Sequence, residues 1–273
     1  MAVINTNIAA TLTANALSRN DRAATQAMER LSTGLKINSA ADDAAGMAMS
    51  NTMTAQVRGL DMAVKNANDA ISMIQTADGA SIEIGDMLQR MRELGVQAVN
   101  GTLTDADRTQ LDLEYQQLIT EIGRVGDNTQ WNGTNLIDDS AGSSGTVTYQ
   151  IGDTAQTMTV DFGDLSDDGD LGLTGDITDS TNAAAAILDV DVAIVALNTQ
   201  RATYGAAINR LEHTVDNLSN VSMNTQAALS RIQDADYAAE STALAKTQII
   251  AQAGTAMLAQ ANQQAQTVLA LLK

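Results

Sequence analysis

The stretch from Ala245 to Lys273 constrains the fold more than any other part of this 273-residue chain. Between Lys246 and Lys273 it carries no charged residue, and many of its polar positions are glutamines. A solvated helix normally carries charges on its outer face, so a helix without them is expected to be surrounded by other protein. Glutamines also interrupt this stretch too often for a membrane span, which needs about 20 predominantly apolar residues. We therefore expect protein partners and no membrane span.

Two heptad stripes of mostly small residues lie near the two ends of the chain. The C-terminal stripe consists of Leu244, Ala251, Leu258, Ala265 and Leu272, with Thr247, Gly254, Ala261 and Val268 following at a distance of three residues. The N-terminal stripe consists of Ala10, Ala14, Leu17, Ala24, Met28, Leu31 and Leu35. Asp21 is the single charge expected within this second stripe. Such stripes are typical of helices that pack closely against other helices.

The amino-acid composition favours a mainly α fold and argues against several functions. Aromatic residues make up 2% of the chain, too few for a thick globular core, and proline, which breaks helices, is absent. We therefore expect a long antiparallel helical hairpin rod with a terminal coiled coil. The absence of cysteine excludes disulfides and Cys-based zinc sites. The net charge of −18 opposes binding to nucleic acid.

The middle of the chain is expected to contain further helices and a small β-hairpin tip. Apolar residues at helical spacing predict helices over residues 44–99, 104–125 and 182–232. The period changes to two in residues 147–151 and 158–162, which is typical of two paired strands. Helices therefore lead to a hairpin and then return.

The segment 161–181 is rich in Asp and Gly and is expected to form an exposed loop. The opening of a calcium-binding loop is imitated by Asp164, Ser166, Asp168 and Asp170. The twelfth position, however, is Gly175 and not the glutamate that closes the coordination sphere. We therefore favour a solvated acidic loop over a calcium site.

No residue pattern typical of an enzyme is found. His213 is the only histidine and lacks the second ligand or base partner that a metal site or a general base would need. A phosphate-binding loop and a dinucleotide-binding glycine motif are also missing. We expect no catalytic residues and no cofactor. Residues 1–17 show no cleavable secretory signal.

Several long motifs resemble bacterial flagellin. They are the run from Leu31 to Ser50 (LSTGLKINSAADDAAGMAMS), residues 209–214 (NRLEHT), residues 230–237 (SRIQDADY), and residues 252–255 and 259–262 (QAGT and AQAN). The resemblance covers roughly residues 1–140 and 183–273. It implies a structural subunit that assembles into the extracellular flagellar filament for swimming. A hook–filament junction protein, which shares terminal heptads, is the alternative.

The resemblance also implies a structural role for each segment of the chain. Residues 1–40 and 236–273 would pair as an inner coiled-coil domain, residues 41–182 would form rod helices with the hairpin and a short acidic loop, and residues 183–235 would form a returning rod helix. The chain would be exported unfolded through the flagellar type III apparatus. A flagellar export chaperone would hold the C-terminal helix, and a filament cap would guide its insertion at the growing tip.

The stretch from Leu88 to Gln97 (LQRMRELGVQ) resembles the segment of some flagellins that a vertebrate Toll-like receptor recognises. The match consists of Gln89, Arg90, Glu93 and Leu94, with Glu114 on the following helix. The alternative is a helix surface that packs against neighbouring subunits. The two uses are compatible with each other.

Overall fold

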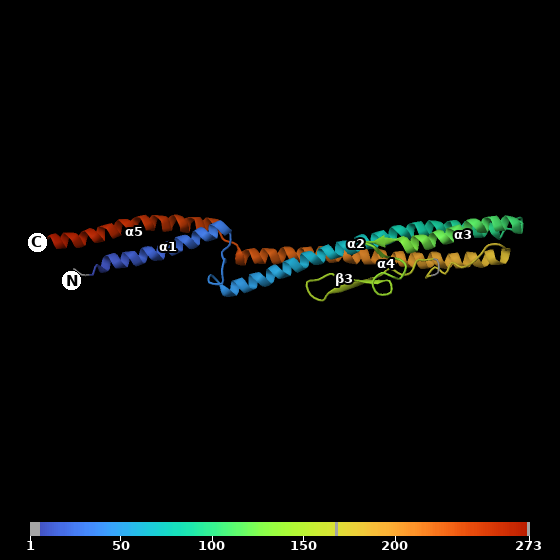
Figure 1. The fold of residues 1–273 in the computed structure, drawn as a ribbon, viewed down its shortest axis with the longest axis horizontal. Coiled ribbons are helices and arrows are strands. Elements are labelled where there is room, and N and C mark those ends of the chain that lie inside the picture. Colours follow the sequence, from blue (N-terminus) through green and yellow to red (C-terminus); the bar gives the residue numbers. More distant parts are fainter. Residues whose placement is uncertain (1–5, 167–168, 272–273) are drawn as a thin grey trace. The chain divides into compact units, whose positions relative to one another are not determined.

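The computed structural model describes residues 6–166 and 169–271 (Figure 1). It is mainly helical, as predicted, with five helices and two small antiparallel strand pairs among the described residues. The chain forms two compact units. Unit 1 comprises residues 1–55 and 224–273, and unit 2 comprises residues 56–223. The predicted inner segments 1–40 and 236–273 both belong to unit 1, which extends further along the chain on both sides.

Unit 1 is built around the antiparallel pair of α1 (Ile8–Thr33) and α5 (Tyr237–Leu271) (Figure 1). Asn7 caps α1, because its side-chain oxygen accepts a hydrogen bond from the backbone N–H of Ala10 at 3.1 Å. Gly34 ends α1 in a left-handed conformation with φ of 74°, which glycine adopts without strain. Asp236 caps α5 by accepting hydrogen bonds from the backbone N–H groups of Ala238 and Ala239.

The structure corrects the phase of the N-terminal stripe. Asn20 and Ala27 are buried, whereas Asp21 and Met28 are exposed. The inward positions therefore follow Ala10, Leu17 and Ala24 at a distance of three residues instead of four. The prediction that Asp21 lies in the seam is wrong. Positions three and four residues apart lie on the same side of a helix, and which one faces inward depends on the partner helix.

Unit 2 contains most of α2 (Ala44–Ala98) and α4 (Ser180–Gln233), together with α3 (Asp105–Asn128). These bounds agree with the predicted helices to within about three residues. The predicted core face of α2 is also confirmed, because Ala67, Ile74, Ala77, Ser81, Ile84, Leu88, Met91 and Ala98 are all buried. On α4, the buried positions include Val190, Leu197, Tyr204 and Leu211.

Helices α2 and α4 pack closely in antiparallel orientation. A Cβ atom at Gly95 would lie 2.8 Å from Cγ1 of Ile187, so only glycine allows this approach. Further along, Nε of Arg201 lies 2.8 Å from a carboxylate oxygen of Asp78. Helix α3 lies beside α2 in the same unit (Figure 1).

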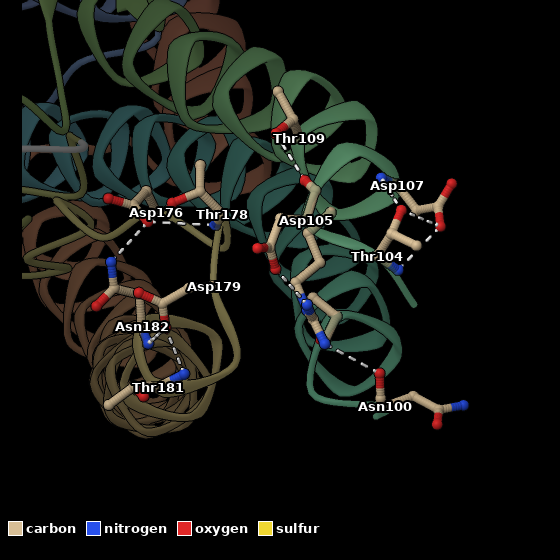
Figure 2. Close-up of polar contacts among 12 residues, drawn as sticks. Asn100, Thr104, Asp105, Asp107, Thr109, Asp176, Thr178, Asp179, Thr181 and Asn182 are labelled. Atoms are coloured by element: carbon tan, nitrogen blue, oxygen red, sulfur yellow. Dashed lines mark hydrogen bonds and ion pairs between the residues drawn. The ribbon is translucent and has the colours of Figure 1, made fainter. Parts of the chain in front are cut away.

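The turn from α2 to α3 is held by two sets of polar contacts, and Figure 2 shows the first of them, around Thr104 and Asp107. Thr104 and Asp107 form a capping box, in which each side chain accepts a hydrogen bond from the backbone N–H of the other residue. Arg108 is buried and donates to the backbone oxygens of Ala98 and Asn100 at 2.8 and 3.3 Å. Its guanidinium thus satisfies the carbonyl of Ala98 at the end of α2, which has no partner within the helix, and gives the Asn100 carbonyl a second donor.

Helix α4 starts two residues earlier than the sequence pattern indicates. Asp179 caps it by accepting bonds from the N–H groups of Thr181 and Asn182 at 2.6 and 3.0 Å (Figure 2). Asp176 accepts from Asn182 Nδ2 at 2.9 Å, which ties the preceding loop to the new helix.

The predicted hairpin is present as β3 (Thr146–Gln150) and β4 (Thr157–Asp161), paired with Val147 opposite Val160. Each strand is shifted by one residue from its predicted range. A second, shorter pair consists of β1 (Gln130–Trp131) and β2 (Thr134–Asn135). Asn132 and Gly133 form its turn with positive φ angles of 49° and 80°. This pair was not predicted, because strands of two residues are too short to show a period of two in the sequence.

The prediction of an exposed loop over residues 161–181 is wrong. The apolar residues of this segment are almost fully buried, namely Phe162, Leu165, Leu171, Leu173 and Ile177. They join the core formed by the helices of unit 2. Acidic and glycine residues dominate the composition, but the dispersed apolar side chains decide where the backbone lies, because burying each one is favourable.

Alkaline pH is expected to destabilise unit 2. Burial disfavours the tyrosinate form and raises the pKa of Tyr115 to about 12 and those of Tyr149 and Tyr204 above their ordinary value of 10.0. Between pH 10 and about 12 the unfolded chain loses protons that the folded chain retains, so the free energy of unfolding falls as pH rises. Below pH 10 these groups are protonated in both states and contribute no pH dependence.

The measurement is the urea midpoint of the chain from pH 8 to pH 12. Tyr115→Phe should make the decline above pH 10 shallower, because it removes one of the titrating groups. A midpoint that stays constant up to pH 12 would contradict this prediction.

Candidate functional site

The α1–α5 pair is joined by three polar contacts along its length. Asn7 Nδ2 donates to the backbone oxygen of Ala261 at 3.0 Å, and Asn20 Nδ2 donates to that of Thr247 at 2.7 Å. Arg30 Nη1 lies 2.9 Å from Glu240 Oε1.

The Arg30–Glu240 contact joins the last turn of α1 to the first turn of α5. A cation at a helix C-terminus and an anion at a helix N-terminus each complement the dipole of their own helix. This ion pair therefore stabilises both helix ends only when those ends lie level with each other.

The predicted seam residues are partly buried where the structure describes their side chains. The partly buried members are Ala10, Leu17, Ala24, Leu31, Leu244, Ala251 and Leu258. Leu17 Cδ1 lies 3.4 Å from the position that a Cβ of Gly254 would occupy. Ala265 belongs to α5, but its side chain is outside the described part, and Leu272 lies outside the described residues.

Both helices of the pair also carry large apolar side chains on their outer surface. These exposed residues are Ile8, Leu12, Met28, Ile249, Ile250 and Met257. A two-helix pair has no room to bury them, since each helix can turn only one stripe toward its partner. A helix pair that leaves this many large apolar side chains exposed is expected to pack against further protein.

Unit 2 has its own exposed apolar surface on α4, formed by Leu188, Val192 and Val195, each about two-thirds exposed. Together with Asp191 and Ala196 these residues line an open cavity of about 490 Å³. Among the described residues, α4 is the one helix with the length and apolar composition of a membrane span, although only 28% of its most apolar stretch is buried. The same features suit a helix that packs against protein on more than one side.

The segment that resembles a receptor epitope forms a charged surface on α2 and α3. Arg90 Nε lies 2.8 Å from Glu114 Oε1, and Arg90 Nη1 lies 3.0 Å from Glu93 Oε2. The hydrogen bonds to Glu114 and then Glu93 raise the pKa of Arg90 above its ordinary value. Gln89 is exposed beside this network.

Leu94 does not belong to this surface. Its side chain is 1% exposed and packs in the core of unit 2. The prediction that Leu94 contacts the receptor directly is therefore wrong, because the side chain is buried. Leu94 follows Met91 by one short helical step, so it continues the buried stripe of α2.

Polar groups of the acidic segment 161–181 form hydrogen bonds with one another. Asp164 Oδ1 accepts hydrogen bonds from Ser166, from its N–H at 3.0 Å and its hydroxyl at 2.6 Å. Asp170 donates its N–H to the backbone oxygen of Asp164 at 2.9 Å, and Asp168 lies outside the described residues. Across residues 6–166 and 169–271, no three His, Asp or Glu side chains gather as a metal ion would need. The part of the chain described here thus provides no metal centre.

Sequence reasoning missed the polar anchors Asn7 and Asn20. Asn7 precedes the first apolar residue of α1 at the position of a helix cap, which was an available signal. Asn20 lies seven residues before Ala27. The sequence alone did not distinguish the stripe through these two residues from the neighbouring stripe through Asp21 and Met28.

Two regions of the chain match known protein families. Residues 4–142 match the bacterial flagellin N-terminal helical region, and residues 187–272 match the bacterial flagellin C-terminal helical region. Together these matches cover most of the chain and leave out the hairpin and the segment that follows it.

Individual relatives are similar over their whole length. A flagellin of Halalkalibacterium halodurans is 47% identical over 274 residues, which cover 99% of this chain and 100% of the relative. The flagellar filament 33 kDa core protein of Treponema phagedenis is 42% identical, with 99% and 100% covered. The crystal structure of Bacillus cereus flagellin superimposes with a TM-score of 0.51 at 36% identity, covering 60% of this chain and 94% of that one.

Proposed function

The chain belongs to the bacterial flagellin family, and from that premise we propose that α1 and α5 form the inner coiled coil of its filament. The chain is a structural subunit of the extracellular flagellar filament, which serves swimming motility, and it is not an enzyme. Similarity to flagellins over 99% of the chain carries this assignment, and it gives the hook–filament junction alternative no comparable support.

The exposed apolar surfaces support the proposed inner coiled coil. The outer faces of α1 and α5 carry large apolar side chains that one chain leaves in water. We infer that copies of the same pair cover them in the filament, and that the Leu188–Val195 surface of α4 packs against a neighbouring rod. Contacts between different surfaces of identical subunits produce an open helix when the rotation between neighbours does not close into a ring.

Seeded elongation tests this assignment. Purified chain, dissociated to monomer by heating and added to filament fragments, should lengthen those fragments in electron micrographs. The length should increase with the concentration of added chain. A chain that fails to elongate seeds in any salt or precipitant would contradict the filament role.

We also propose that an export chaperone holds α5 before assembly and that a filament cap receives the chain at the tip. Ile249, Ile250 and Met257 are exposed in the single chain and would promote aggregation during transport. A chaperone groove that takes the apolar face of a helix would protect them. The absence of cysteine suits a chain that passes unfolded through a pore.

The charged surface of α2 and α3 is proposed as a contact for a vertebrate Toll-like receptor. This surface consists of Gln89, Arg90, Glu93 and Glu114, and the buried Leu94 is not a part of it. The ion pairs hold the Arg90 guanidinium in one place, which lowers the entropy that binding would otherwise cost.

Arg90→Ala should therefore weaken binding of the monomeric chain to the receptor ectodomain by at least about tenfold, because arginine is frequent among interface hot spots. Arg92→Ala is the matched control. Arg92 lies on the same helix, is about as exposed, and pairs with Asp191 on α4 at 2.6 Å. Equal losses for both variants, or no loss for Arg90→Ala, would argue against this receptor surface.

A further inference from the structure

The charged residues of the chain are divided unevenly between the two units. Unit 1 contains seven lysines and arginines and seven aspartates and glutamates, so its formal net charge is zero. Unit 2 contains eight basic and 26 acidic residues and therefore carries the whole net charge of −18. Copies of unit 1 can approach one another without net electrostatic repulsion, whereas copies of unit 2 repel one another. Of the two units, unit 1 is therefore the better suited to close packing between identical chains.

Helix α5 of unit 1 presents one oxidisable side chain in apolar, uncharged surroundings. Met257 is 63% exposed, and it lies two turns after the exposed residues Ile249 and Ile250 on the same side of the helix. The positions one turn away from Met257 on α5 are all uncharged, namely Ala253, Gly254, Gln260 and Ala261. A second copy of the chain can therefore bury this face without removing a charge from water.

Met62 on α2 of unit 2 provides the contrast. Its side chain is 55% exposed, close to the value for Met257. Arg58 precedes it by four residues, Lys65 follows it by three, and both are exposed. A contact that buried Met62 would have to remove these charges from water, which is unfavourable. The two methionines are thus similarly open to a small oxidant but lie in different surroundings.

Methionine differs from the isoleucines beside it because peroxide oxidises its thioether. The sulfur attacks one oxygen of hydrogen peroxide, and the S–O bond forms as the O–O bond breaks. The proton of the attacked oxygen moves to the departing oxygen, which leaves as water. Sulfur loses two electrons, and the peroxide gains them. The product, methionine sulfoxide, is polar and accepts hydrogen bonds, so it does not suit a buried apolar contact.

We propose that Met257 is a site at which oxidation controls assembly, because peroxide converts the free chain to a form that does not join the filament. The inference rests on the proposed packing of α5 against copies of the same helix pair. In the free chain the thioether is exposed and reacts, whereas neighbouring copies cover and protect it once the chain is built in. Methionine sulfoxide reductases, with a thiol as reductant, restore the thioether, so the block is reversible.

The test uses two full-length chains that differ in which exposed methionine remains. One chain keeps Met257 and the other keeps Met62. Leucine, which has nearly the same volume, replaces the other exposed methionines in both chains. The residues replaced are Met28, Met49, Met223 and either Met62 or Met257. Each monomer is treated with hydrogen peroxide, the sulfoxide at each methionine is quantified by mass spectrometry, and elongation of filament seeds is then measured.

At equal sulfoxide content, the chain that keeps Met257 should need an about tenfold or higher concentration to elongate seeds, because an unpaired polar group in a buried contact is costly. The chain that keeps Met62 should change by less than about twofold, as is usual for exposed positions. Sulfoxide reductases with dithiothreitol should restore elongation of the first chain. In filaments of the unsubstituted chain, Met257 should be oxidised more slowly than in the free chain.

Two single variants give the same test without an oxidant. Met257→Gln places a polar, uncharged side chain at this position and should impair elongation, whereas Met62→Gln should not. The proposal is overturned if Met257→Gln elongates seeds normally, if oxidation impairs both chains equally or neither, or if Met257 is oxidised equally fast in free chain and filament. Each of these results leaves the filament role intact. Failure of the untreated, unsubstituted chain to elongate seeds would instead contradict the filament role and this proposal together.

Discussion

A chain that lacks residues 245–273 should remain monomeric and should not elongate filament seeds. The deletion removes most of α5, and with it the Thr247 carbonyl that binds Asn20 and the small residues that face Leu17. Helix α1 then has nothing to cover its inward stripe. Because most of the stability of such helices comes from packing, α1 should lose its helical structure in the truncated monomer.

Sedimentation and electron microscopy measure the loss of elongation, and circular dichroism measures the loss of helix. Unit 2 provides the internal control, since its core between residues 56 and 223 contains none of the deleted residues. Its thermal unfolding should be retained. If the truncated chain elongated seeds at the normal rate, α5 would not be part of the filament core.

Phe162→Ala should lower the free energy of unfolding of unit 2 by about 3–5 kcal/mol, the usual effect of removing a fully buried aromatic ring. Phe162 is the only phenylalanine of the chain and is 0% exposed. Its ring centroid lies 5.8 Å from that of Tyr204, and its backbone oxygen accepts a hydrogen bond from the Tyr204 hydroxyl at 2.6 Å. This contact fixes the end of β4 to α4.

Urea unfolding followed by circular dichroism gives the change, and two variants separate its causes. Phe162→Leu keeps an apolar side chain and should lose clearly less. Tyr204→Phe removes only the hydrogen bond and should lose about 1 kcal/mol. An unchanged midpoint for Phe162→Ala would mean that the hairpin is not packed on α4 in solution.

The long helices could be predicted because their apolar residues recur over many turns. In α2, the stripe from Ala67 to Ala98 repeats so often that no other face could be buried. The inward face of α1 was harder, since Asn20 and Asp21 are both compatible with the heptad. The choice depends on where α5 lies, which a local pattern does not contain.

The segment after β4 could not be predicted for a different reason. Phe162, Leu165, Leu171 and Ile177 are buried without any regular spacing, because an irregular backbone carries them to the core. Leu94 shows the same limit for a site residue. Resemblance to a receptor epitope identifies a stretch of helix, but only packing decides which of its side chains reach the surface.

The two hydrogen bonds of Asn7 couple the start of α1 to the distant part of α5. One side chain closes the first turn of α1 with its oxygen and binds the Ala261 carbonyl with its nitrogen, although 254 residues separate the two positions in the chain. Since the amide must be held in one orientation for both bonds, the beginning of the first helix and the far part of the last one become ordered together. A subunit that lacks the C-terminal part of α5 would therefore also lose order in the first turn of α1. Truncation at one end of the chain would thus change the structure at the other end.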